Sequence, residues 1–271
     1  MKRRGKISKA IHRIYIALIM LFLYSPIAVL ILFSFNAGES RGKFAGFSLR
    51  WYKDLVNRDA LLGSFRNTLI VAAIASVVAT LIGTYAAIVI HKMPGIMRNS
   101  TIKVANIPML NAEIVTGIAF MLFFGAISVP LGFSTILIAH ITFNVPYVIL
   151  SVLPKLRQLN KSTYEAALDL GATPAMAFRK IVLPDILPGI ISGLLIAFTL
   201  SLDDFIISYF TAGAAFKTLS VEINTLTKRR IPLSVNALST IIMIVVFVIL
   251  VINNLRKRPN GNKALIKERS A

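Results

Sequence analysis

The sequence contains no cysteine among its 271 residues, which excludes disulfides, thiolate zinc sites and catalytic thiols. It also lacks a phosphate-binding G-x-x-x-x-G-K-[ST] loop, a G-x-S-x-G nucleophile elbow and a His-Glu metal pattern. The histidines are scattered, and we expect the one inside an apolar run, His140, to serve packing or helix–helix hydrogen bonding. The chain therefore carries no motif for hydrolysing ATP by itself.

Charged residues make up only 15% of the chain, and acidic residues are the scarcer kind. Eleven Asp and Glu stand against 30 Lys and Arg, so the formal net charge is +19. In a soluble chain this balance would indicate nucleic-acid binding. Here 56% of the residues are hydrophobic, and the basic residues cluster beside apolar runs, as in MKRRGKISKAIHR. We therefore expect a membrane protein that contacts membrane lipid and no nucleic acid.

Six apolar segments are long enough to cross a bilayer as helices, because a hydrocarbon core about 30 Å thick needs roughly 20 residues. We predict an all-α integral membrane protein with spans at Ile14–Phe35, Thr68–Ile90, Ile102–Phe124, Leu131–Leu153, Ile186–Phe210 and Val235–Ile252. A basic N-terminal segment (1–13) and a basic tail (253–271) flank this transmembrane domain (14–252).

Most Lys and Arg lie in the termini and in the loops on the same side as the termini. Positively charged segments are retained in the cytoplasm, so we expect both termini and the loop between the fourth and fifth spans to be cytoplasmic. Three basic residues depart from this pattern, because Lys228, Arg229 and Arg230 fall in the last outer loop. The sequence gives them no role.

The cytoplasmic loop contains the stretch EAALDLGATPAMAFRKIVLP, which has the signals of two short helices. Ser162 precedes Glu165 by three residues, the spacing of a capping box, and Gly171 is placed to end the first helix in a left-handed conformation. Thr173 and Pro174 begin the second helix, and Pro184 marks its end. Helices this short are not stable alone in water and must be stabilised by packing against other elements or a partner. The pair is either a surface hairpin packed on the protein's own helices or a docking element for a soluble partner.

Seven residues of this stretch resemble the EAA motif of ATP-binding-cassette (ABC) importer permeases: Glu165, Ala166, Ala167, Gly171, Ile181, Leu183 and Pro184. The resemblance implies the type I permease fold, with residues 162–184 forming coupling helices that seat on an ATPase. It also implies a homologous permease as heterodimer partner, two cytoplasmic ATPase subunits and an extracytoplasmic substrate-binding protein in a prokaryotic cytoplasmic (inner) membrane. The chain would then be a transport subunit rather than an enzyme. It would hold no cofactor, and ATP and Mg would bind to the ATPase.

Three carboxylates lie in apolar surroundings: Glu113 at mid-depth of the third predicted span, and Asp203 and Asp204 near the outer end of the fifth. A carboxylate inside a membrane is costly unless it is paired or faces water, so intramembrane acids are candidates for a transport pathway. The alternative is an ion pair or a helix cap. An acidic pathway suits a cationic substrate, to which aromatic faces such as Phe205, Tyr209 or Phe210 would add cation–π attraction.

Shorter strings, among them SLDD, AHITFNVPYVI, WYKDL and SVNALSTI, are similar to the second permease of the spermidine/putrescine importer family. This resemblance implies polyamine import by ATP-driven alternating access. Two alternatives stay open. The importer could carry another solute, such as ferric iron, thiamine or phosphonate, or the chain could be a self-sufficient secondary transporter with Asp203 or Glu113 as a proton-coupled carboxylate.

Overall fold

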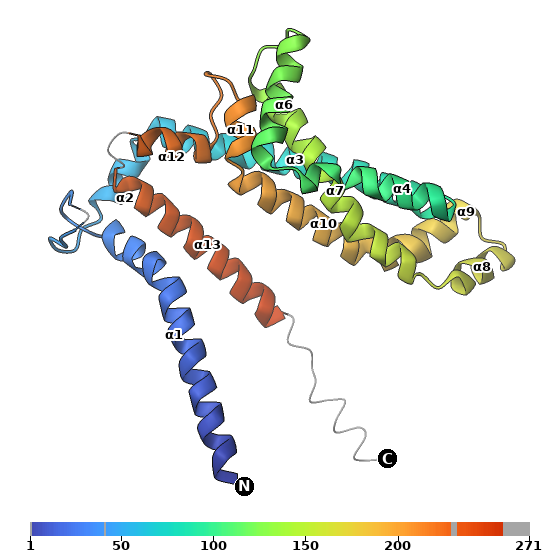
Figure 1. Cartoon of the computed structure of the whole chain (residues 1–271), viewed down its shortest axis with the longest axis horizontal. Helices are drawn as coiled ribbons and strands as arrows, with labels where there is room; N and C mark the ends of the chain where they lie inside the picture. The colour runs from blue at the N-terminus through green and yellow to red at the C-terminus, as the bar shows by residue number, and fades with distance from the viewer. Residues whose placement is uncertain (1, 41, 229–231, 257–271) are drawn as a thin grey trace. The chain divides into compact units, whose positions relative to one another are not determined.

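The computed structural model describes residues 2–40, 42–228 and 232–256. Within these ranges the named elements are all helices, and a single β-bridge joins Asn36 to Phe47 (Figure 1). The helices are α1 (Lys2–Ser34), α2 (Arg50–Val56), α3 (Asp59–Lys92), α4 (Gly95–Ala105), α5 (Ile107–Leu110), α6 (Glu113–Ala126), α7 (Phe133–Gln158), α8 (Lys161–Asp169), α9 (Pro174–Ala177), α10 (Leu183–Asp203), α11 (Ile206–Thr211), α12 (Leu219–Thr227) and α13 (Ser234–Arg256). A π-helical turn, Phe178–Val182, lies between α9 and α10. The predicted basic tail falls mostly outside the described residues.

The chain divides into two compact units, and the first is built from α1, α2 and α13. Trp51 of α2 is buried against Leu233 and Ala237 at the start of α13, and its indole Nε1 donates a hydrogen bond of 2.6 Å to the Asn36 carbonyl. The short helix α2 is therefore an amphipathic loop helix that packs its apolar side on α13.

The second unit runs from α3 through most of α12, and its centre is the packing of α7 against α10. Small residues let the two backbones approach closely. A Cβ built on Gly189 would lie 2.9 Å from the Ser151 carbonyl oxygen, and one on Gly193 would lie 3.2 Å from Val148 Cγ1. Small residues four apart are typical of helix contacts within membranes. Around this contact, Val148, Val152 and Ile186 form a buried apolar core.

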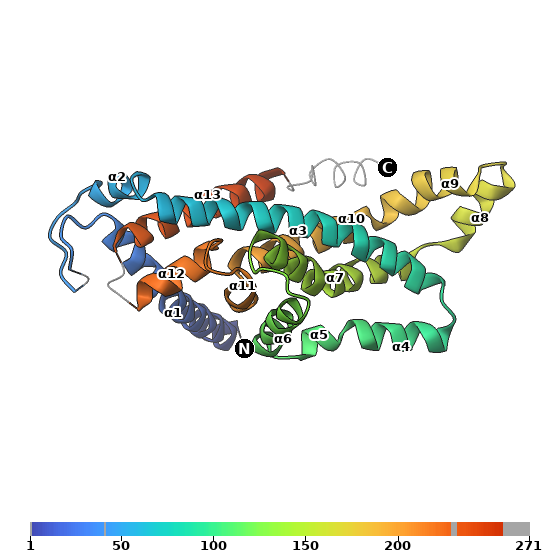
Figure 2. The ribbon, with the colours of Figure 1, turned by 90° about the horizontal axis from the view of Figure 1, so that it is seen from above.

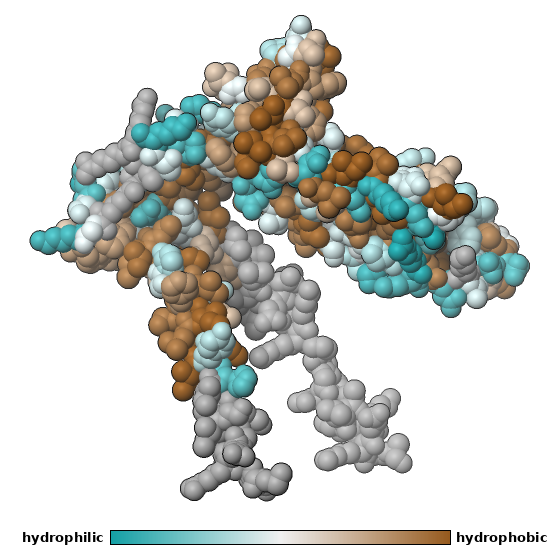
Figure 3. Space-filling view, in the orientation of Figure 1, coloured by the Kyte–Doolittle hydropathy of each residue, from teal (hydrophilic) through white to brown (hydrophobic). Residues whose placement is uncertain are grey.

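Four helices are long and apolar enough to cross a membrane: His12–Ser34 in α1, α3, α7, and the continuous run Pro174–Asp203. They correspond to the first, second, fourth and fifth predicted spans. The shorter apolar helices are α6 and the Ser234–Ile244 part of α13. Apolar side chains cover much of the surface of α6, where Leu122 and Phe123 are exposed (Figure 3). Such a surface suits contact with lipid or with another subunit.

The third predicted span, Ile102–Phe124, is wrong as a single helix. The chain ends α4 at Ala105, makes the short helix α5, and becomes extended at Asn111 and Ala112 before α6 begins. Pro108 has no backbone N–H and its ring opposes a regular helix across this stretch. Glu113 consequently lies in the first turn of α6 and not inside one continuous helix.

The fifth predicted span, Ile186–Phe210, is also interrupted. Helix α10 ends at Asp203, Asp204 is extended with ψ 127°, and α11 begins at Ile206. Both predicted spans that contain candidate carboxylates are therefore broken beside those carboxylates.

Candidate functional site

Five of the seven residues that resemble the EAA motif lie in a hairpin of α8, a turn, α9 and the π-helical turn, which we call the EAA hairpin (residues 161–182). Figures 1 and 2 show α8 and α9 projecting beyond the ends of α7 and α10. Gly171 has φ +84°, the left-handed conformation predicted for it. Its N–H bonds to the Leu168 carbonyl, and the Ala172 N–H bonds to the Ala167 carbonyl. This pair of bonds is a Schellman motif that ends α8 sharply.

The second helix of the hairpin begins as predicted. Thr173 Oγ1 accepts a hydrogen bond of 3.3 Å from the Met176 N–H, and Pro174 occupies the first helical position. The predicted capping box of α8 is wrong, because Asn160 is the cap: its Oδ1 accepts from the Ser162 N–H at 3.0 Å. An Asn side chain is as good a cap as Ser and here lies one residue before the helix.

Pro184 does not end the second helix, contrary to the prediction. The chain continues from α9 through the π-helical turn into α10, and Pro184 lies in the first turn of α10. The wider turn, in which a backbone N–H reaches one residue further back, gives a helix a way to accommodate local irregularity such as a proline. The EAA hairpin is therefore directly continuous with a membrane-spanning helix.

Four of the seven motif residues line two hollows. Glu165 and Ile181 line a cavity between the hairpin and the ends of α3 and α7. Ala167, Gly171 and again Ile181 line a shallower hollow on the hairpin itself. Ala166 is exposed, whereas Leu183 and Pro184 belong to the first turn of α10.

Two apolar residues on the hairpin were missed by the sequence analysis. Leu170 is 89% exposed and Met176 is 47% exposed, and both line the hollow around Gly171. Exposed apolar side chains on a small capped element are typical of a docking surface. Both residues lie within the stretch that carries the motif, so the sequence could have identified them. They were missed because neither occupies one of the seven signature positions.

The three candidate carboxylates come together. Glu113, Asp203 and Asp204 line one cavity of about 340 Å³, although they lie on two separate broken helices. The Glu113 and Asp203 side chains belong to exposed residues, so both are open to the cavity. The rest of the lining is aromatic, polar and aliphatic: Phe143, Tyr147, Phe205, Thr116, Pro108, Leu200, Ile206 and Ile207. We call this the carboxylate cavity.

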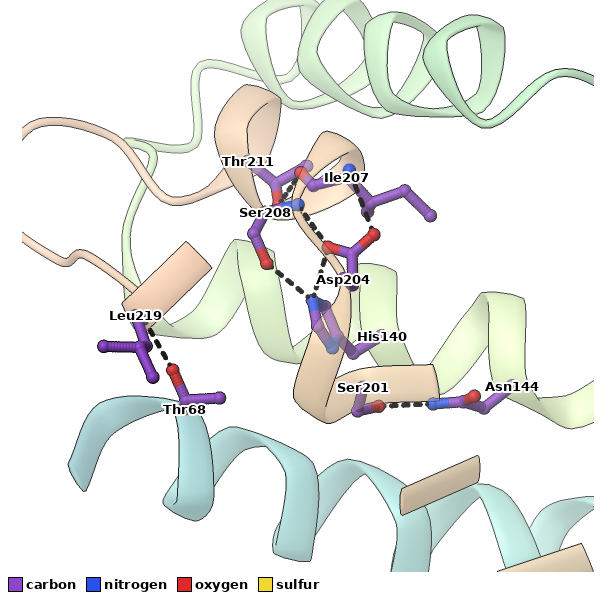
Figure 4. Close-up of polar contacts among 9 residues, drawn as sticks. All are labelled: Thr68, His140, Asn144, Ser201, Asp204, Ile207, Ser208, Thr211 and Leu219. Carbon is purple, nitrogen blue, oxygen red and sulfur yellow. Dashed lines mark hydrogen bonds and ion pairs between the residues drawn. The ribbon is translucent and has the colours of Figure 1, made fainter. Parts of the chain in front are cut away.

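Asp204 has a different environment from Asp203. Only 6% of its side chain is exposed. Its Oδ2 accepts a hydrogen bond of 2.7 Å from the Ser208 N–H, and its Oδ1 accepts one of 3.3 Å from the Ile207 N–H (Figure 4). Asp204 thus caps α11, which otherwise starts with unpaired N–H groups at a helix break.

His140 on α7 connects to the same break. Its Nε2 lies 3.4 Å from Asp204 Oδ2 and 3.1 Å from Ser208 Oγ (Figure 4). One helical turn further along α7, Asn144 Nδ2 donates a hydrogen bond of 2.7 Å to Ser201 Oγ of α10. The predicted structural role of His140 in helix–helix hydrogen bonding is confirmed. These contacts fix α10 and α11 on α7 and so hold the carboxylate cavity in shape.

Sequence reasoning found some of the aromatic lining and missed the rest. Phe205 lines the cavity as expected, and its ring lies 5.6 Å from that of Tyr209. Tyr209 and Phe210 are not part of the lining, whereas Phe143 and Tyr147 of α7 are. In the loop after α12, Lys228 is exposed, and Arg229 and Arg230 lie outside the described residues.

Solved structures with the same fold are ABC importers. A crystal structure of a bacterial ABC transporter involved in the import of the acidic polysaccharide alginate superposes with a TM-score of 0.71, covering 95% of this chain and 98% of that chain at 15% identity. A second structure, of a bacterial alginate ABC transporter in complex with an alginate pentasaccharide-bound periplasmic protein, gives a TM-score of 0.69 at 17% identity over 94% of this chain and 95% of that chain. The chain therefore has the all-α fold of type I ABC importer permeases.

Sequence relatives make the assignment specific. The family of the binding-protein-dependent transport system inner membrane component matches residues 79–258. The spermidine/putrescine transport system permease protein PotC of Haemophilus influenzae is 34% identical over 241 residues, which cover 89% of this chain and 94% of the relative. The putrescine transport system permease protein PotI of Escherichia coli (strain K12) is 38% identical over 230 residues, 82% of each chain. The chain belongs to this family of inner-membrane transport permeases, which favours an importer permease over a self-sufficient secondary transporter.

Proposed function

We propose that this chain is the permease subunit of an ABC importer that moves polyamines, spermidine or putrescine, into the cytoplasm by ATP-driven alternating access. One observation carries the choice of cargo: Glu113 and Asp203, from two different helix breaks, open into one cavity beside aromatic rings. The names of the relatives point to the same class of substrate.

The chemistry of the carboxylate cavity suits an elongated polycation. Each ammonium group of a polyamine carries a positive charge, and two separate carboxylates match two such groups along a methylene chain. The rings of Tyr147, Phe143 and Phe205 line the space around the carboxylates. Aromatic faces attract cations and also cover apolar methylenes. The volume of about 340 Å³ lies at the lower end of the range for small-molecule sites.

The EAA hairpin is the proposed contact with a soluble ATPase on the cytoplasmic side. Leu170 and Met176 present apolar surface there, and Gly171 permits the sharp turn between them. The chain would pair with a homologous permease and receive its cargo from an extracytoplasmic binding protein. ATP and Mg would act on the two ATPase subunits, and both termini of this chain would be cytoplasmic. Closure of the ATPase would then push on Glu165 to Gly171.

A test of cargo and coupling is uptake of labelled spermidine and putrescine into proteoliposomes that contain this chain with its permease, ATPase and binding-protein partners. We expect uptake that requires ATP and is competed by unlabelled polyamine. If ATP hydrolysis responds to the permease but no polyamine enters, the cargo is another solute such as ferric iron, thiamine or phosphonate.

The pathway itself is tested with the double variant Glu113→Gln and Asp203→Asn in the same assay. Loss of two charged partners should lower uptake by roughly tenfold or more, since a hydrogen bond to a charged group contributes about 1.5–3 kcal/mol. Asp59→Asn is the matched control, because Asp59 is an exposed acid at the start of α3 outside the cavity. Uptake at the wild-type rate in the double variant would show that the carboxylate cavity is not the pathway.

A further inference from the structure

A second cavity lies beside the EAA hairpin, at the other end of α10 from the carboxylate cavity. Its volume is about 300 Å³, and four segments enclose it: the C-terminal ends of α3 and α7, the first turns of α8, and the π-helical turn. We call it the hairpin socket.

The socket differs from the hollow around Gly171 in the elements that line it. The hollow around Gly171 is lined by residues of the EAA hairpin alone, so it suits the proposed ATPase contact. The socket instead opens between the hairpin and two membrane-spanning helices, α3 and α7. The socket therefore lies at the ends of two helices of membrane-spanning length, where lipid headgroups are found.

The walls of the socket are apolar and its rim is cationic. Leu156 is buried, and the side chains of Ile88, Phe178 and Val182 supply further apolar wall. Lys92 and Arg157 are both exposed at the rim. Among the described residues, no ion pair joins either cation to an acid, and Glu165 is the only acid in the lining.

We propose that the hairpin socket binds an anionic phospholipid of the cytoplasmic leaflet. The headgroup phosphate would contact Lys92 and Arg157, and the first part of an acyl chain would lie against Ile88 and Phe178. The apolar walls match the acyl chain of such a lipid, and the two cations match its headgroup. Basic residues near the membrane surface attract anionic headgroups. The cytoplasmic placement rests on the proposed function.

The bound lipid would act on coupling. Tyr164 and Glu165 line the socket from α8, and Ile181 lines it from the π-helical turn. A lipid in the socket would fill the space between the hairpin and the membrane helices that it moves. A well-packed contact transmits movement of the hairpin to the helices, whereas an empty cavity allows the hairpin to move without them. The transport rate should therefore depend on the fraction of anionic lipid.

Binding is measured with the complete importer in nanodiscs of phosphatidylcholine that contain spin-labelled phosphatidylglycerol, from the fraction of label that is immobilised. The variant Lys92→Gln with Arg157→Gln should weaken this association by roughly tenfold. The matched control, Arg98→Gln with Lys103→Gln, removes two cations from α4 that do not line the socket and should leave the association unchanged. A third variant, Val182→Phe, fills the socket without changing charge and should also release the lipid.

Several outcomes would overturn the proposal. The first two are equal immobilisation of the label in the Lys92/Arg157 variant and its α4 control, and unchanged lipid binding in Val182→Phe. The third is full competition by soluble glycerol phosphate. The fourth is lipid that binds to the isolated chain but is displaced when the ATPase joins. The last outcome would assign the socket to the ATPase. Lipid binding does not depend on cargo, so failure of polyamine uptake with retained, variant-sensitive lipid binding would remove the polyamine assignment alone.

Discussion

Two neighbouring carboxylates do different work at the α10–α11 break. Asp204 is buried, caps α11 and contacts His140, whereas Asp203 is exposed to the carboxylate cavity. Adjacent residues at a helix break point in different directions because the backbone leaves the helical path between them. The substrate role therefore belongs to Asp203 together with Glu113, and Asp204 supports the shape of the site.

This division gives a stability prediction. Asp204→Ala should destabilise the protein by about 1–2 kcal/mol, since it removes the side-chain cap of α11 and leaves the Ser208 N–H without its acceptor. Thermal unfolding of the purified complex in detergent measures the effect. Asp203→Ala is the control and should change stability by less than about 0.5 kcal/mol, because the side chain is exposed. Equal destabilisation by both substitutions would contradict the division.

The sequence predicted which acids come together but not which of them caps a helix and which opens to the cavity. Carboxylates in apolar runs are conspicuous, so Glu113, Asp203 and Asp204 could be selected by type and surroundings. The cap requires knowledge of where α10 ends, which the apolar pattern does not reveal. Phe143 and Tyr147 were missed because aromatic residues are common throughout the spans, and the face of α7 that meets the cavity depends on tertiary packing.

The turn of the EAA hairpin depends on the left-handed backbone of Gly171. Gly171→Ala places a Cβ on a residue with φ +84°, which costs about 1–2 kcal/mol and favours a different turn. ATP-driven uptake should fall while the chain still assembles with its partners. Gly171→Asn is the control, since Asn tolerates the left-handed conformation, and it should retain most of the uptake. If Ala and Asn were equally harmful, the backbone conformation would not be the cause.

The close contact between α7 and α10 depends on the absence of a side chain at Gly189. Gly189→Ala should destabilise the protein by about 1–3 kcal/mol, because the new Cβ would lie 2.9 Å from the Ser151 carbonyl oxygen and from Lys155 Cγ. Gly63→Ala is the matched control in α3, where nothing lies within 4 Å of the added Cβ. It should be neutral or slightly stabilising, since Ala favours a helix. Thermal unfolding of the two variants separates the contact from the general effect of replacing glycine.

The sequence predicted the existence of the helices better than it predicted where they end. The Gly171 turn and the Thr173 cap follow from local chemistry and were found. The breaks at Asn111 and Asp204, and the passage through Pro184, were not found. An apolar stretch of sequence looks the same whether it forms one helix or two. A π-helical turn can also accommodate a proline that would otherwise end a helix.

For the molecule as a whole, the proposed ATPase contact and the carboxylate cavity lie at the two ends of one continuous helical run. Pro174–Asp203 comprises 30 residues, or roughly 45 Å along a helix axis. The run begins in the EAA hairpin and ends at the carboxylate that opens to the cavity. A continuous helical run of this kind can convert movement of the hairpin into movement of Asp203.

Softening the middle of this run should uncouple the two ends. Leu195→Gly with Ile196→Gly changes two exposed residues near the centre of α10, and each glycine costs about 1 kcal/mol of helix stability relative to alanine. We expect polyamine uptake per ATP hydrolysed to fall severalfold while hydrolysis continues. The Leu195→Ala with Ile196→Ala variant removes the same side chains but keeps the helix stiff, so it should stay coupled. Equal uptake per ATP in the glycine and alanine variants would mean that force reaches the carboxylate cavity by another route.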